Sequence, residues 1–159
     1  MQGLLGRAAA ILASCLGAGA ALAAGDFPAA SCKGWNGTVV EREGLDTPRA
    51  VMRGIVTRAD IWEYCERDPG GETRARGGRL TLGQCVETHL AEEIRTRLVA
   101  EADCRAGRIT FRYSGREPLR ARFPMPPDAD TSCASGMPPV IAQFRMLCPT
   151  AARRMRLPD

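Results

Sequence analysis

Apolar residues recur every four positions along one long segment, and this spacing is typical of a helix that packs one face on a core. The stripe consists of Leu82, Val86, Leu90, Ile94 and Leu98. Thr81 and Gln84 match the two ends of a capping box, so a helix is expected to begin at Thr81. We predict one continuous helix from there to about Ala102.

Two earlier segments also carry signals for the start of a helix. Thr57 and Asp60 form a variant of the capping box ahead of residues 58–67. Upstream, Thr47 is suited to the N-cap position and Pro48 to the first helical position. We therefore predict a helix over 58–67 and a shorter one that begins at Pro48.

Strict alternation of apolar and polar residues takes over after Gly107, and it predicts a β-hairpin over residues 108–123. One face of this hairpin is apolar, with Ile109, Phe111, Tyr113, Leu119, Ala121 and Phe123. The other face carries four arginines, Arg108, Arg112, Arg120 and Arg122. A further strand is expected around residues 38–41.

The remaining segments complete the expected order of elements. Residues 72–79 are a polar loop after the breakers at 68–71, and residues 124–136 form a Pro- and Asp-rich loop. Val140–Leu147 is expected to be a short helix, and residues 150–159 a flexible basic tail. The fold class is therefore α+β, with two or three helices packed on a small antiparallel sheet.

The N-terminal segment has the features of a secretory signal peptide over residues 1–23. Arg7 supplies the positive charge, an apolar run of roughly 16 residues is short for a membrane-spanning helix, and Ala21–Ala23 offers an A-x-A cleavage site. An alternative is lipidation at Cys15, since residues 12–15 resemble a lipobox. Against it, the chain after Cys15 stays apolar, whereas a tether is normally polar. Neither reading leaves a membrane span in the mature chain.

Six cysteines remain once the leader is removed, and an even number in an exported chain favours disulfides. They are Cys32, Cys65, Cys85, Cys104, Cys133 and Cys148. Six cysteines allow fifteen pairings, and the sequence alone does not choose among them. If the helix from Thr81 is continuous, Cys85 and Cys104 lie about 28 Å apart, which excludes that bridge. An antiparallel pair of helices favours Cys65–Cys85, and Cys104–Cys148 and Cys32–Cys133 are the preferred remaining bridges.

Residues 25–149 are long enough for a single domain with its own core. The full chain has 159 residues and a formal charge of +4, and without Arg7 its 21 basic and 18 acidic residues leave +3. This charge is too small to indicate a specific nucleic-acid partner. Lys33 is the only lysine. Arginine grips carboxylates and phosphates with two parallel hydrogen bonds, so an anionic partner suits this bias.

Candidate chemistry is sparse. His89, the only histidine, lies one helical turn from Cys85 and from Glu93, and all three are zinc-ligand types, but the spacing matches no established metal motif. Asp128 and Asp130 resemble the start of a calcium loop, yet the glycine and glutamate that such a loop needs are absent, which favours a solvated turn. No nucleophile elbow, phosphate-binding loop or C-x-x-C pair occurs. We expect no cofactor, no metal and no catalytic residues.

The arginine face of the hairpin is the candidate anion-binding surface. Like charges on neighbouring strands are unfavourable, so something is expected to compensate them. The partner is unknown, and the candidates are an acidic protein, a polyanionic component of the cell envelope, or acidic side chains of the same chain.

Four segments of the chain surround cysteines, namely residues 64–71, 80–86, 102–104 and 144–149. Together they resemble a group of small exported proteobacterial proteins whose function is uncharacterised, and the resemblance spans roughly residues 48–149. It implies a shared disulfide-bearing scaffold and transfers no activity.

These observations predict a periplasmic or secreted protein with a non-catalytic binding or envelope-associated role. One alternative is an exported metal-dependent protein or enzyme that uses His89 and a free cysteine. The second is a lipoprotein subunit anchored through Cys15.

Overall fold

A computed structural model describes residues 25–32, 34–67 and 80–157 of the chain. The expected signal peptide, the lipidation candidate Cys15 and the expected polar loop at residues 72–79 lie outside the described residues. Within them, no helix is long and apolar enough to cross a membrane.

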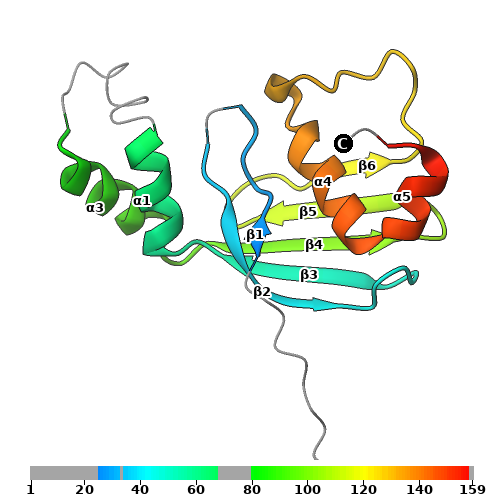
Figure 1. Ribbon diagram of the computed structural model, residues 1–159, viewed down its shortest axis with the longest axis horizontal. Coiled ribbons are helices and arrows are strands. Elements are labelled where there is room, and N and C mark those ends of the chain that lie inside the picture. The colour runs from blue at the N-terminus through cyan, green and yellow to red at the C-terminus, as the bar shows by residue number, and fades with distance from the viewer. Residues whose placement is uncertain (1–24, 33, 68–79, 158–159) are drawn as a thin grey trace, which may run out of the picture.

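Within the described residues, six antiparallel strands form one sheet in which every strand pairs with its neighbours in sequence (Figure 1). The strands are β1 (Asp26–Phe27), β2 (Gly37–Glu43), β3 (Ala50–Ile55), β4 (Arg97–Asp103), β5 (Arg108–Tyr113) and β6 (Leu119–Arg122). The described residues also contain four α-helices and one 3-10 turn. They are α1 (Arg58–Arg67), α3 (Leu82–Glu93), α4 (Met137–Leu147), α5 (Pro149–Met155) and η1 (Cys133–Ser135). The predicted α+β class is confirmed.

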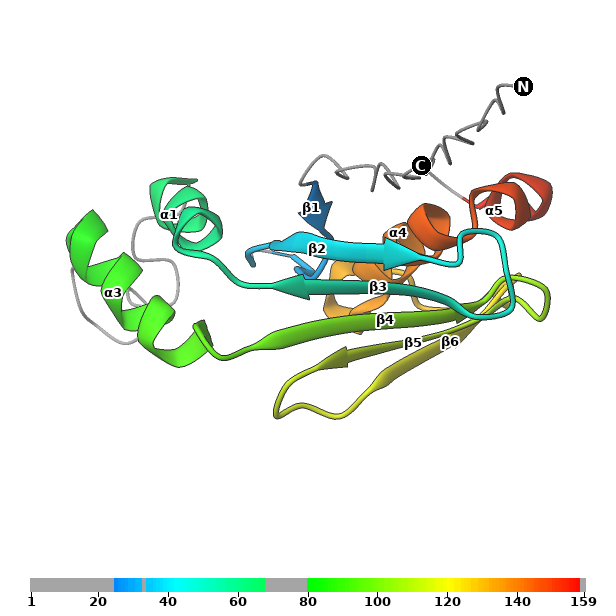
Figure 2. The same cartoon turned by 90° about the horizontal axis from the view of Figure 1, so that it is seen from below.

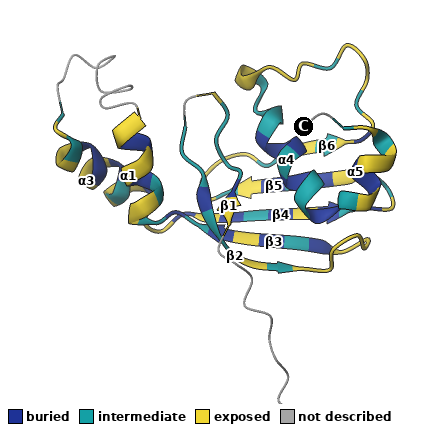
Figure 3. Ribbon diagram, viewed as in Figure 1, coloured by how far each residue is buried: buried dark blue, intermediate teal, exposed yellow. Residues whose placement is uncertain are grey.

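The helices occupy two places relative to the sheet. α4 and α5 cover one face, which we call the inner face, whereas α1 and α3 stand together beyond the end of β3 and the start of β4 (Figure 2). The opposite, outer face is covered by no helix among the described residues. The buried positions of the strands lie on the inner face, whereas the outer face is exposed or half-buried (Figure 3). Most of the core lies between the inner face and α4, and it extends to the buried sides of α1 and α3. Its largest fully buried side chains include Phe27, Met52, Leu98, Phe144 and Leu147.

The predicted helix over 58–67 is confirmed as α1 with the same bounds. Asp60 accepts hydrogen bonds from the backbone N–H and the hydroxyl of Thr57, both at 2.7 Å, and Thr57 Oγ1 accepts from Asp60 N–H. This reciprocal arrangement is the capping box that the two residues predict. The hairpin is confirmed as β5 and β6, and the strand around 38–41 lies within β2.

Three element predictions were wrong. The helix from Thr81 ends at Glu93, and residues 97–103 form β4. The helix expected from Pro48 is replaced by β3, in which the buried residues alternate. The flexible tail expected at residues 150–159 is instead largely the helix α5, which buries Ala151 and Ala152.

All six described cysteines are in disulfides, and all three preferred bridges are confirmed. They are Cys32–Cys133, Cys65–Cys85 and Cys104–Cys148, with Cα–Cα distances of 4.8, 6.1 and 5.2 Å. The bridges tie the N-terminal loop to η1, α1 to α3, and the end of β4 to the α4–α5 junction. The Cys85–Cys104 bridge is absent as expected, although the continuous helix on which that exclusion rested does not exist.

Candidate anion-binding face

The four predicted arginines lie on one face of the sheet, as the alternation requires. Arg108 is directly opposite Arg122 across the β5–β6 ladder, and Arg120 is opposite Thr110. The residues between them, Ile109 and Phe111, are buried on the inner face. Side chains on a strand alternate between the two faces, so the arginines point to the uncovered outer face.

The outer face carries rows of alternating charge, one row on each strand. Glu41 and Glu43 on β2 are followed by Arg53 on β3, and its guanidinium lies 2.6 and 3.0 Å from their carboxylates. These carboxylates raise the pKa of Arg53, with the Glu43 hydrogen bond as the larger cause. Exposed pairs of this kind contribute little to stability individually. Their effect is to cancel charge locally.

The next two rows are Glu101 and Asp103 on β4, and Arg108 and Arg112 on β5. Arg112 pairs with Glu101, and Arg108 Nη2 lies 3.3 Å from Asp103 Oδ2. The N–H of Ala106 and, to a smaller extent, Arg108 lower the pKa of the Asp103 carboxyl, so it stays ionised. Internal counter-charges thus neutralise two of the four predicted arginines.

The β6 row is not compensated in this way. Arg120 and Arg122 are exposed, and neither forms an ion pair with any described residue. Arg49, just before β3, is likewise exposed and without an ion pair among the described residues. The structure therefore leaves three arginines of this face available to an outside anion.

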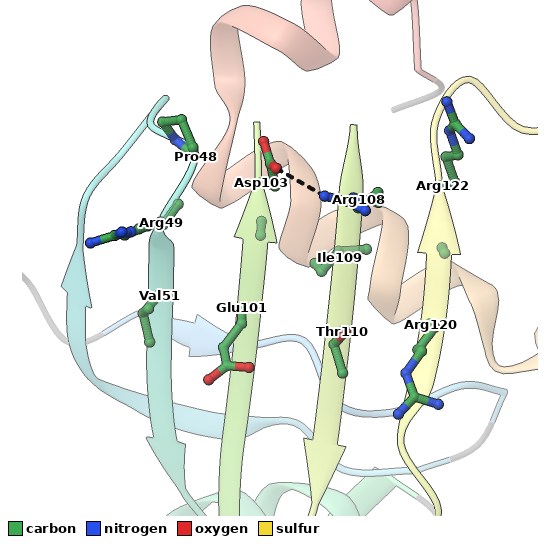
Figure 4. Close-up of a pocket in the computed structure, with 13 residues that line it drawn as sticks. Pro48, Arg49, Val51, Glu101, Asp103, Arg108, Ile109, Thr110, Arg120 and Arg122 are labelled. Carbon is green, nitrogen blue, oxygen red and sulfur yellow. Dashed lines mark hydrogen bonds and ion pairs between the residues drawn. The ribbon is translucent and has the colours of Figure 1, made fainter. Parts of the chain in front are cut away.

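A shallow hollow of about 810 Å³ lies in the same face (Figure 4). It spans β3 to β6, with Arg49 at one side, Arg120 and Arg122 at the other, and the Asp103–Arg108 pair between them. Three predicted residues, Arg108, Arg120 and Arg122, line the hollow, and Arg112 does not. The Arg49 contribution was missed because its segment was predicted to be a helix.

His89 lies at a different place, on α3 away from the arginine face. It is buried, and its ring centroid lies 5.1 Å from that of Trp35 and 5.5 Å from that of Tyr64. Cys85 is bonded to Cys65, so the free thiol that the enzyme or metal alternative requires does not exist among the described residues. The described residues also contain no group of three metal-ligating side chains. Packing against aromatic rings is the role that the structure gives to His89.

Glu93, the third member of that candidate metal group, has a structural partner instead. Its Oε2 accepts hydrogen bonds from the hydroxyls of Thr96 and Tyr113, both at 2.7 Å. Burial raises the pKa of the Tyr113 hydroxyl, and the hydrogen bond to Glu93 raises it further. These bonds connect the end of α3 to β5.

A second hollow, of about 480 Å³, lies next to this aromatic group. Trp35, Tyr64, Phe111, Tyr113 and Leu119 form its apolar wall, and the Arg116 guanidinium stacks 4.4 Å from the Tyr113 ring centroid. Arg116, the one cation among the described residues that line this hollow, thus already has an aromatic contact within the chain.

The candidate calcium loop is a turn, as its missing ligands indicate. Asp130 Oδ1 accepts a hydrogen bond of 2.8 Å from Ser132 N–H, and hydrogen bonds from Ser132 lower the pKa of Asp130. This is an Asx turn, a common local use of aspartate in loops. The turn leads into η1.

Similarity to known proteins adds no assignment to these features. The three disulfides are typical of proteins in an oxidising compartment. No protein-family model, curated protein or solved structure matches the chain.

Proposed function

We propose that the protein is an exported, non-catalytic binding module, secreted or periplasmic, that holds an anionic partner on the outer face of its sheet. The observation that carries the proposal is the uncompensated charge of Arg120 and Arg122 beside a hollow on that face. Among the described residues, the charged rows on β2, β3, β4 and β5 each have a row of opposite charge on a neighbouring strand. A row of arginines without counter-charge favours binding of carboxylates or other anions.

Export is supported by the N-terminal sequence and by the disulfides. Signal-peptide cleavage and lipidation at Cys15 both deliver the domain to the same side of the membrane. Intact-mass measurement of the exported protein distinguishes them, since a lipid adduct on Cys15 identifies an anchored subunit.

Retention on a heparin column tests the binding proposal with a generic polyanion. We expect the double variant Arg120→Glu/Arg122→Glu to elute at clearly lower salt than the wild type, because it replaces the uncompensated row with repulsive charge.

The matched control is Arg153→Glu/Arg154→Glu, which makes the same charge change at exposed positions of α5. We expect this control to elute close to the wild type. Equal losses for the two double variants would show that net charge alone governs retention, and the proposal would then fail.

A further inference from the structure

The open edge of β6 leaves backbone polar groups without a partner in the part of the chain that the structure describes. Phe123 N–H donates to Gly107 C=O at 2.6 Å, so this pair continues the β5–β6 ladder by one hydrogen-bonded rung past Arg108 and Arg122. Bonded and non-bonded rungs alternate in an antiparallel ladder. The N–H and C=O groups of Arg120 and Arg122 therefore point away from β5, and no described residue bonds to them.

The same two residues carry the uncompensated side chains. Opposite-charge rows face each other between β2 and β3 and between β4 and β5, but β5 and β6 are both basic. An acidic row on a strand next to β6, on the side away from β5, would continue the pairing of opposite charges. One additional acidic strand beside β6 would supply both hydrogen bonds for these backbone groups and carboxylates for the two guanidinium groups.

We infer that β6 binds an extended acidic peptide as a seventh, antiparallel strand of the sheet. This inference rests on the proposed function and narrows its anionic partner to a polypeptide. Residues opposite each other on neighbouring strands point to the same face. The peptide must therefore carry Asp or Glu at two positions separated by one residue, so that their carboxylates reach the guanidinium groups of Arg120 and Arg122. Strand addition of this kind takes affinity from the backbone and selectivity from alternate side chains.

A second copy of the chain fits this edge less well. Two β6 strands side by side would bring arginine against arginine, which is a recognised way of preventing edge-to-edge association. β2 does carry acids two positions apart, at Glu41 and Glu43, but both already pair with Arg53. A separate acidic segment remains as the occupant.

The probe is a capped seven-residue peptide in which Thr and Glu alternate, beginning and ending with Thr. Its control has the same composition with Glu at the first, fourth and seventh positions, which keeps the charge but leaves no two Glu residues separated by a single residue. Calorimetry on the disulfide-bonded protein is expected to show tighter binding of the alternating peptide. The Arg120→Glu/Arg122→Glu variant should bind neither.

Two N-methylated versions of the alternating peptide test the backbone pairing directly. Methyl groups on the Glu amides block the N–H groups that would donate to Arg120 and Arg122, and we expect affinity to fall by about tenfold or more. Methyl groups on the Thr amides lie on the far edge and should have little effect. In hydrogen exchange, the amides of Arg120 and Arg122 should become protected on binding.

The outcomes separate the two proposals. If acidic peptides bind but alternation and Glu methylation make no difference, strand addition is overturned while anion binding stands. If heparin alone binds, and binds through these arginines, the partner is not a peptide and the inference fails. If sedimentation shows that the protein self-associates through β6, a second copy is the occupant and the inference again fails. If no anion depends on Arg120 and Arg122, both proposals fail.

Discussion

Gly54 lies where β3 passes close to the ring of Phe27. A Cβ atom at position 54 would lie 2.5 Å from Phe27 Cδ2, and Phe27 is fully buried. We expect Gly54→Ala to destabilise the protein by about 1–3 kcal/mol, because the ring or the strand must shift within a packed core. Denaturant unfolding with the disulfides intact measures the loss.

Gly83 provides the control for that substitution. It lies in the first turn of α3, and a Cβ there would meet no atom within 4 Å. Gly83→Ala should leave stability unchanged or raise it slightly, since alanine is the better helix former. Equal effects at the two glycines would contradict the close approach of Phe27.

Tyr113 couples β5 to the end of α3 through its bond to Glu93. Burial and this bond raise its pKa above the usual value of about 10. The phenolate should therefore form at a higher pH in the folded than in the unfolded chain. The contribution of Tyr113 to stability is then fully present below about pH 10 and is lost as the pH rises further.

An absorbance titration measures the pH at which Tyr113 ionises, because the chain has only two tyrosines. The difference between the wild-type curve and the Tyr113→Phe curve gives the ionisation of Tyr113. We expect its midpoint above the usual value. A midpoint at or below about 10 would show that the hydroxyl is neither buried nor bonded to Glu93.

At the scale of elements, α5 is positioned by a residue distant in sequence. Asp46, in the turn before β3, accepts hydrogen bonds from Thr150 N–H at 2.9 Å and from its hydroxyl at 2.8 Å. Asp46 also has a φ of 59°, a conformation that aspartate and asparagine tolerate better than alanine. It therefore acts as a cap for α5 across the fold.

We expect Asp46→Ala to cost about 1–2 kcal/mol of stability, because it removes the cap and strains the backbone. Asp46→Asn should cost less, since it keeps an acceptor oxygen and tolerates the same conformation. Thermal unfolding of both variants measures the difference. Hydrogen exchange should locate the loss in α5, and unchanged exchange there would contradict the capping role.

Two of the three element errors in the sequence prediction have a cause that can be read in the residues themselves. Leu90, Ile94 and Leu98 are four residues apart, a spacing that suits one face of a helix and one face of a strand equally. The chain turns between α3 and β4 without a glycine or proline, so nothing in the sequence marks the change, and Ile94 ends up exposed. At β3, Thr47 and Pro48 favoured the start of a helix, although the residues that follow form a strand with alternating burial.

The site was predictable to the extent that it depends on strand alternation alone. The shared face of the four arginines followed from alternation within the hairpin, and the register confirms it. The acids that compensate Arg108 and Arg112 were not predicted, because their strand had been assigned to the long helix. Which arginines stay uncompensated depends on the order of strands, and that order is a tertiary property.

At the scale of the whole molecule, the number of arginines without an acidic partner sets how much basic charge the outer face presents. Glu101 and Asp103 together hold Arg112 and Arg108 in ion pairs. Removing their charges with Glu101→Gln/Asp103→Asn should increase retention on a polyanion, because it adds two uncompensated arginines to the two on β6. The amides can still accept hydrogen bonds, including the one from Ala106 N–H to residue 103, so the fold should persist.

Glu63→Gln/Glu66→Gln gives the matched control, because it raises the net charge equally at exposed positions of α1, away from the sheet. Salt-gradient elution from heparin compares the two double variants. A larger shift for the sheet variant is expected, since exposed charges act over about a Debye length, roughly 10 Å in dilute salt. Equal shifts would mean that net charge, and not the arrangement of rows, attracts the anion. The order of charge along the sheet would then have no functional consequence, and the arginine face would be a solvated surface.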